Sequence, residues 1–195
     1  MIDRRSRYAV MVAAVFLVGT AGLAEASGAS VAGSMRAVTT TPFADPAIDP
    51  ACKVVFDAND KTLDTPNHAY QEHLDPGGKN VTTELITVNG QRYLLVNGTW
   101  KKSRMTVADT KAQEEENKKN AKVVSCKRVG TDSVNGQAAT VYTEHSENDD
   151  TKADGKVWIS SSGVILKNEI ELDTGDATKS KITIRYEYGN VKAPI

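Results

Sequence analysis

Three Asn-Gly pairs, each placed between runs of β-branched and apolar residues, constrain the fold of this chain more than any other feature. They are Asn89-Gly90, Asn97-Gly98 and Asn135-Gly136. An Asn-Gly pair favours the two-residue turn of a β-hairpin, so each pair predicts two antiparallel strands that follow one another directly. We therefore predict a meander of strands at 81–88, 91–96 and 99–105, and a hairpin that joins 122–129 to 137–145.

The remaining strands have side chains that alternate between apolar and polar. They are predicted at 70–74, 156–161, 164–172 and 181–188. A polar loop is predicted at 146–155. In the last strand Ile182, Ile184 and Tyr186 alternate with polar residues, and neighbouring residues of a strand point to opposite faces. The eight or nine predicted strands should therefore form an antiparallel sheet with one apolar face and one mixed face.

Two helices are predicted. The first, at 50–63, begins at Asp49-Pro50, where a capping residue is followed by proline in the first helical position. Its apolar residues fall at helical spacing and are Cys52, Val55, Phe56 and Leu63. The second, at 107–120, follows Thr106 in an approximate capping box and is nearly all polar. We interpret it as a short, solvated surface helix, with a partner-binding role as the alternative.

These elements predict an α+β fold in which a strongly curved antiparallel sheet, a half-barrel, wraps the N-terminal helix. The apolar face of the sheet would bury the amphipathic side of that helix. A closed barrel with the helix at one end would use the same pattern.

The N-terminal residues predict export. Arg4, Arg5 and Arg7 precede a largely apolar run at 8–23, which ends in Ala24-Glu25-Ala26. A basic start, a short apolar run and a small-x-small site are typical of a cleaved signal peptide. The apolar run is shorter than the roughly 20 residues of a membrane span. We expect cleavage after Ala26, a periplasmic or secreted protein, and no transmembrane segment in the mature form.

The mature chain divides into two parts. Residues 27–48 are rich in Ser, Ala, Gly, Thr and Pro and are predicted to be a flexible leader. Residues 49–195 are enough for a single domain. This domain contains both cysteines of the chain, Cys52 and Cys126. An even pair in an oxidising compartment predicts one disulfide, and a redox or metal pair would need closer spacing or further ligands.

Several chemistries are excluded by composition and spacing. The formal net charge is −1 and basic and acidic residues are interspersed, so no nucleic-acid partner is expected. His68 and His73 would point to opposite faces of one strand, and His145 is distant in sequence. Lys152 would occupy a ligand position in the acidic stretch at 148–155 if that stretch bound calcium. No G-x-S-x-G nucleophile motif occurs. We therefore expect no catalytic residue, metal or cofactor.

Four aromatic residues are the candidate ligand-binding residues: Tyr93, Trp100, Trp158 and Tyr186. Tyrosine and tryptophan offer a large apolar surface together with a polar group. The alternative is that they fill the core of the sheet or brace its edges.

The order of elements resembles that of the outer-membrane lipoprotein-sorting and carrier superfamily, the LolA/LolB-like periplasmic proteins. The resemblance lies in an N-terminal amphipathic helix, in the segments 90–105 and 156–172, and in the closing strand with Tyr186-Glu187-Tyr188. It implies an incomplete barrel with a helical lid around an apolar cavity that receives acyl chains. The chain departs from those carriers in its length and its polar second helix. No position is assigned to their cavity arginine, although Arg92 lies on a predicted strand.

The sequence therefore predicts an exported protein that binds an apolar or amphiphilic ligand, such as a lipid or a lipoprotein acyl chain, without catalysis. An envelope protein-interaction module without a small ligand is the alternative, and a hydrolase is the third candidate. A carrier should contain a cavity of several hundred Å³, whereas a concave face filled by its own side chains would favour the interaction module.

Overall fold

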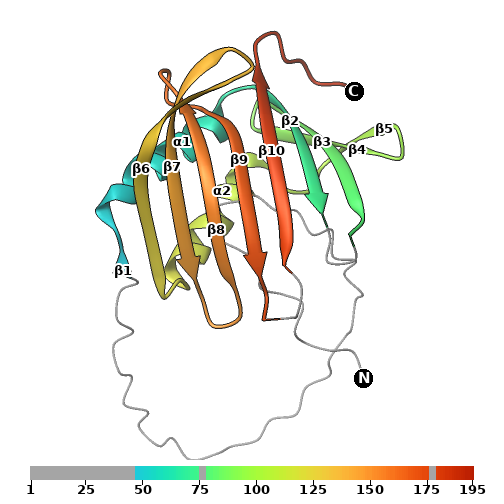
Figure 1. Ribbon diagram of the computed structural model, residues 1–195. Helices are drawn as coiled ribbons and strands as arrows, with labels where there is room; N and C mark the ends of the chain where they lie inside the picture. The colour runs from blue at the N-terminus through green and yellow to red at the C-terminus, as the bar shows by residue number, and fades with distance from the viewer. Residues whose placement is uncertain (1–46, 75–77, 176–178) are drawn as a thin grey trace, which may run out of the picture.

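The computed structural model describes residues 47–195 apart from 75–77 and 176–178. The predicted signal peptide at 1–26, and the leader as far as residue 46, lie outside the described residues. Within the described part, ten strands form one curved sheet, and both α-helices lie on the same side of it (Figure 1). The predicted half-barrel around an N-terminal helix is confirmed. The sheet is open, because β1 and β5 are its two edges in the described strand order.

The strands run in the order β1-β6-β7-β8-β9-β10-β2-β3-β4-β5 across the sheet. Their bounds are Ala47–Ile48 for β1, Asn67–Leu74 for β2, Asn80–Val88 for β3, Gln91–Val96 for β4, Thr99–Lys102 for β5, Val123–Val134 for β6, Gln137–Glu147 for β7, Lys152–Ser160 for β8, Ile165–Asp173 for β9 and Ser180–Tyr188 for β10. All neighbours are antiparallel except β1 and β6. The N-terminal meander β2–β5 thus joins the C-terminal strands through the pairing of β2 with β10.

The predicted Asn-Gly turns are confirmed by their backbone angles. Asn89, Asn97 and Asn135 have φ values of 53°, 51° and 51°, and the glycine after each also has a positive φ. Left-handed φ values at both central positions are those of a turn that joins adjacent antiparallel strands without splaying them. These turns therefore set the register of β3 with β4, of β4 with β5, and of β6 with β7.

The first helix crosses the concave face of the sheet. It consists of a 3-10 turn, Pro50–Cys52, and α1, Lys53–Asp64, close to the predicted bounds of 50–63. Its buried residues include Val55 and Ala58. Thr62 Oγ1 donates to the carbonyl of Ala58 at 2.8 Å and accepts the N–H of Ile165 at 2.8 Å, which ties the last turn of α1 to β9. The helix therefore leads the chain from the β6 side of the sheet to β2.

The predicted disulfide is present between Cys52 and Cys126, whose Cα atoms are 5.0 Å apart. Cys52 is fully buried and Cys126 is 7% exposed. The bond anchors the N-terminal end of α1 to β6. Both sulfurs belong to a core cluster with α1 residues such as Val55 and sheet residues such as Val157 and Ile165.

Some element boundaries differ from the prediction. The polar stretch at 146–155 is mostly strand, because β8 begins at Lys152 and pairs with β7 as far as Glu147. Ala153 lies in the core, so this part of the chain has a buried face in spite of its polar composition. β6 continues to Val134 through a bulge between Arg128 and Gly130. β5 ends at Lys102, three residues earlier than predicted.

Strand structure is also present on the N-terminal side of the predicted domain boundary at residue 49. β1 places Ala47 and Ile48 in parallel pairing with Val123 and Val124. The N–H of Asp49 then donates to the carbonyl of Val124 at 2.9 Å. The end of the predicted leader thus covers the first two residues of β6.

The second helix, α2, Val107–Lys119, lies beside α1 and contacts it. Its capping box is confirmed, because Thr106 and Asp109 bond each other's backbone N–H groups. Val107 and Thr110 are its buried residues. Lys111 forms an ion pair with Asp64 of α1 at 2.8 Å. Most of α2 is exposed, as predicted for a surface helix.

Candidate functional site

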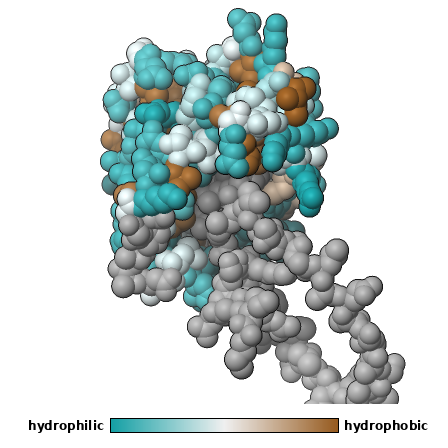
Figure 2. Space-filling view, turned by 90° about the vertical axis from the view of Figure 1, so that its right-hand side faces the viewer, coloured by the Kyte–Doolittle hydropathy of each residue, from teal (hydrophilic) through white to brown (hydrophobic). Residues whose placement is uncertain are grey.

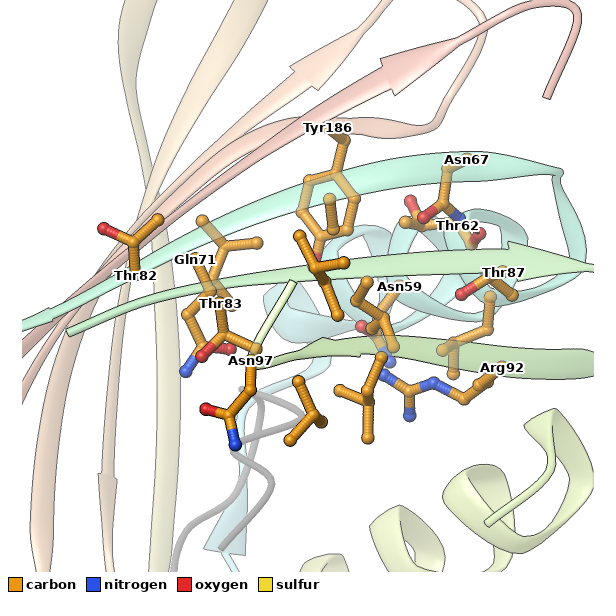
Figure 3. Close-up of a pocket in the computed structure, with 17 residues that line it drawn as sticks. Asn59, Thr62, Asn67, Gln71, Thr82, Thr83, Thr87, Arg92, Asn97 and Tyr186 are labelled. Carbon is orange, nitrogen blue, oxygen red and sulfur yellow. Dashed lines mark hydrogen bonds between the residues drawn. The ribbon is translucent and has the colours of Figure 1, made fainter. Parts of the chain in front are cut away.

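A cavity of about 310 Å³ lies between the C-terminal end of α1 and strands β2, β3, β4 and β10 (Figure 3). Its wall is the concave face of the sheet, which the rest of the molecule leaves unfilled at this point. The cavity exists because α1 ends at Asp64 and the chain turns directly into β2. Strands β3 and β4 therefore extend beyond the area that α1 covers.

Strand register arranges the cavity wall in three rows. Asn67 pairs with Thr87, which pairs with Arg92, and this row is polar. Ala69 pairs with Leu85, which pairs with Leu94, and this row is apolar. A third row, Gln71 with Thr83, is again polar. Because paired residues of neighbouring strands point to the same face, each row presents one kind of side chain to the cavity.

Exposure increases from the first row to the third. Asn67, Thr87 and Arg92 are 2–3% exposed. Leu85, Leu94, Gln71 and Thr83 are partly exposed, and Thr82 and Asn97 beyond them are exposed. Figure 3 shows the same two ends, with Asn67, Thr62, Thr87 and Arg92 at one and Gln71, Thr82, Thr83 and Asn97 at the other. The cavity therefore has a closed polar end, an apolar middle and an open polar mouth.

The closed end contains a buried cation. Arg92 is 2% exposed, and its Nη1 donates to Oγ1 of Thr110 on α2 at 2.8 Å. Burial lowers the pKa of Arg92 to about 10, because removing a charged group from water favours its neutral form. The guanidinium remains protonated at neutral pH and directs positive potential into the closed end.

Asn67 adds a buried acceptor at this end. Its Nδ2 donates to the carbonyls of Thr62 and Thr65, both at 2.8 Å. These two bonds determine the orientation of the amide, since only the nitrogen can donate to two carbonyls. The amide oxygen Oδ1 is buried and accepts no hydrogen bond from the described residues.

Two further titratable groups lie near Arg92. Burial, and then the nearby carboxylate of Asp60, raises the pKa of Glu114 on α2 to about 7. Asn59 Nδ2 donates to Glu114 Oε2 at 2.6 Å. Burial raises the pKa of Tyr186, which lines the cavity from β10, to about 12. At neutral pH Tyr186 is therefore a neutral hydroxyl, while Glu114 is partly protonated.

The four aromatic residues proposed from the sequence are not brought together. Tyr186 lines the cavity, whereas Tyr93 pairs with Ile86 on the opposite face of the sheet. Trp100 packs edge-on against His68 with ring centroids 5.8 Å apart. Trp158 is 7% exposed, and its Nε1 donates to Asp132 Oδ2 at 3.0 Å. A ligand role for Tyr93, Trp100 and Trp158 stays a prediction, and only Tyr186 lies in this site.

Sequence reasoning did not propose Asn67, Thr87 or Arg92 as site residues. The sequence places Arg92 on a predicted strand but assigns no role to it. The missing information was the pairing of β2 with β10, which forms the wall that Arg92 faces.

His68, His73 and His145 lie outside the cavity, and His68 and His145 pair with carboxylates. His68 Nε2 is 3.0 Å from Glu84 Oε2. His145 Nδ1 is 2.8 Å from Asp154 Oδ1, and this hydrogen bond raises the pKa of His145. Among the described residues no group of three or more His, Cys, Asp or Glu side chains is arranged to hold a metal ion. Within the same residues no helix combines the length and apolarity needed to cross a membrane.

Several solved structures are similar to this chain. The lipoprotein LppX of Mycobacterium tuberculosis is 12% identical, with 74% of this chain and 100% of that chain covered and a TM-score of 0.43. MucB, crystallised in complex with MucA(peri), is 14% identical, with 74% and 57% covered and a TM-score of 0.45. A LolA superfamily protein from Nitrosomonas europaea is 8% identical, with 74% and 94% covered and a TM-score of 0.24.

No protein-family model matches the chain, and no curated protein matches it. Sequence identities of 8–14% give no information on ligands. Any ligand of this chain has to be inferred from its own residues.

Proposed function

We propose that this protein is an exported, non-enzymatic binding protein that holds an apolar or amphiphilic ligand in the cavity between α1 and β2–β4. The observation that carries the proposal is the cavity itself, about 310 Å³ with an apolar middle row between two polar rows. This volume lies at the lower end of the range of roughly 300–1,000 Å³ typical of ligand sites. An unfilled cavity on the concave face supports a carrier over an interaction module, in which side chains of the protein itself would fill that face.

The lining supports binding rather than hydrolysis. The described lining residues are threonines, amides, aliphatic residues, Arg92 and Tyr186, without serine, cysteine, histidine or carboxylate. A hydrolase needs a nucleophile or an activated water next to a base. Transfer of an apolar chain onto Leu85, Leu94 and Ile184 would instead be driven by removal of apolar surface from water, at roughly 25 cal/mol per Å².

Native mass spectrometry tests this function. Protein isolated from a periplasmic extract should carry an additional mass that organic extraction removes, and its chain should begin at Ser27. The extracted protein should then bind decanoate. Thr83→Trp, at the cavity mouth, should abolish binding, whereas Thr131→Trp, on an exposed position of β6, should not. Failure of folded, extracted wild-type protein to bind any single-chain amphiphile would refute the proposal.

An envelope protein-interaction module is the second candidate, and one observation favours it. Within the described part of the chain, β1 covers only Val123 and Val124 of the long strand β6. Unpaired N–H and C=O groups on a strand edge can accept a further strand. Two features oppose this, namely the bulge at Arg128 to Gly130 and the charged residues beside it, since both discourage edge-to-edge pairing. Among the described residues visible in Figure 2, hydrophilic side chains predominate and hydrophobic ones are scattered between them.

A further inference from the structure

The geometry of the cavity indicates more than an apolar ligand. Resting on the function proposed above, we infer that the ligand is a single-chain amphiphile that enters head group first. Its head group is an anion that also carries a hydrogen-bond donor, and it is bound at the closed end by the row of Asn67, Thr87 and Arg92.

The volume limits the ligand to one chain. A cavity of about 150 Å³ holds one benzene molecule. The cavity here, at about 310 Å³, has roughly twice that volume. It accommodates one aliphatic chain of about ten carbons with a small head group. Two or three acyl chains of membrane length would have to leave most of their surface outside the mouth and would gain little from binding.

The position of the charge determines the orientation. If an apolar chain end reached the closed end, hydrocarbon would lie against Arg92, which is 2% exposed, and against Asn67, whose Oδ1 is buried. Contact of buried polar and charged groups with hydrocarbon is costly unless a ligand group bonds them. The polar groups of the mouth, at Thr82 and Asn97, are exposed and remain hydrated in either orientation. Only the closed end therefore distinguishes the two orientations, and it favours the head group.

The two kinds of polar atom at the closed end specify the head group. Arg92 can only donate, so it selects an acceptor, and an anion in particular. Asn67 Oδ1 can only accept, because the two bonds from Nδ2 fix the amide. The hydroxyl of Thr87 lies between these residues in the row and can do either. A carboxylate with a hydroxyl nearby, as in a 3-hydroxyalkanoate, matches all three residues, whereas a plain carboxylate leaves Asn67 without a donor.

Ligand comparison tests the head group on the unaltered protein. Extracted wild-type protein would be titrated calorimetrically with 3-hydroxydecanoate, decanoate and decyltrimethylammonium at pH 7. We expect 3-hydroxydecanoate to bind about three- to tenfold more tightly than decanoate, the effect of one hydrogen bond to a buried acceptor. The cation should bind at least tenfold more weakly than decanoate. Equal affinity for the two carboxylates would overturn the assignment of Asn67, and equal affinity for the cation would overturn the anion site.

Nuclear magnetic resonance tests the orientation. Decanoate labelled with ¹³C at the carboxyl or at the terminal methyl would be bound to wild-type protein and exposed to a soluble gadolinium chelate. Entry of the head group predicts strong relaxation of the methyl carbon and protection of the carboxyl carbon. The opposite pattern would overturn this inference while leaving the proposed function intact. Absence of binding by every amphiphile would overturn both.

Variants locate the head-group site. Arg92→Met replaces the guanidinium by an unbranched apolar side chain and should weaken decanoate binding at least tenfold. Arg185→Met is the matched control, because Arg185 is exposed on β10 and pairs with Glu72 outside the cavity. Its affinity should equal that of wild type. Unchanged binding by folded Arg92→Met would refute the site, and if that variant does not fold, the relaxation measurement on wild-type protein decides.

Discussion

Glu144 provides the sharpest test of the electrostatics of this fold. It lies on the concave face of β7, paired with Cys126 of β6 on one side and Gly155 of β8 on the other. Glu144 is 8% exposed, and its Oε1 accepts no hydrogen bond from the described residues. Burial raises the pKa of Glu144 from 4.5 to about 8. An acid that keeps its proton in the folded state and releases it on unfolding makes stability fall as pH rises between these two values.

The size of the effect follows from the two pKa values. Linkage between 4.5 and about 8 gives a loss of about 3 kcal/mol of folding free energy at pH 7 and about 1 kcal/mol at pH 5. Glutamine has the shape of the protonated acid and cannot ionise. Relative to wild type, Glu144→Gln should therefore gain about 2 kcal/mol of stability between pH 5 and pH 7.

Urea unfolding at pH 5 and pH 7 measures this difference. Glu147→Gln is the control on the same strand, because Glu147 pairs with Lys152 and His145 and these hydrogen bonds lower its pKa. Its contribution is present above the unfolded pKa and is lost only on acidification, so this variant should not become more stable at pH 7. A free-energy difference between wild type and Glu144→Gln that is the same at both pH values would refute the reasoning.

Three other changes test the framework of the fold. Replacing both Cys52 and Cys126 by alanine opens a loop with a sequence separation of 74 and should reduce the free energy of unfolding by about 4 kcal/mol. Urea titrations measure this loss, and a loss below about 1 kcal/mol would contradict the prediction. Thr106→Ala removes the N-cap of α2 and should lower the free energy of opening of its first turn by about 1 kcal/mol. Amide hydrogen exchange in that turn should accelerate accordingly, and unchanged exchange rates would contradict the prediction. Thr62→Val leaves a buried N–H of β9 without an acceptor and should cost about 2 kcal/mol in the same titrations. Thr65→Val is its control, and equal losses in both variants would argue against the bond.

Local patterns in the chain were sufficient for most elements. The Asn-Gly pairs predicted the hairpin turns, because few other residue pairs adopt two consecutive positive φ values at low cost. Alternation predicted the buried faces of strands such as β10, since side chains repeat every two residues. Helical spacing after Asp49 predicted the first helix, and the export compartment suggested the bond between Cys52 and Cys126.

Where polar composition opposed the geometry, these patterns failed. The stretch at 146–155 looked like a loop because it contains Asp149, Asp150 and Asp154, yet it supplies the start of β8. Pairing with β7 and β9 gives this segment its hydrogen bonds, and burial of Ala153 compensates for its polar neighbours. Strand propensity depends on the type of side chain. A central strand is stabilised in addition by backbone hydrogen bonds to both neighbouring strands, whatever its side chains are.

The candidate site depended on contacts between distant parts of the chain. Alternation can assign Thr87 and Arg92 to faces of predicted strands, but Asn67 precedes the predicted strand at 70–74, and alternation does not say which strands are neighbours. The pairing of β2 with β10 placed the meander against the C-terminal strands, and the end of α1 at Asp64 left the cavity between them. Arg92 is buried where α2 approaches β4, and there Thr110 of α2 accepts a hydrogen bond from its guanidinium. Burial and electrostatic potential arise from everything that surrounds an atom in space, and a single strand holds only a small part of those surroundings.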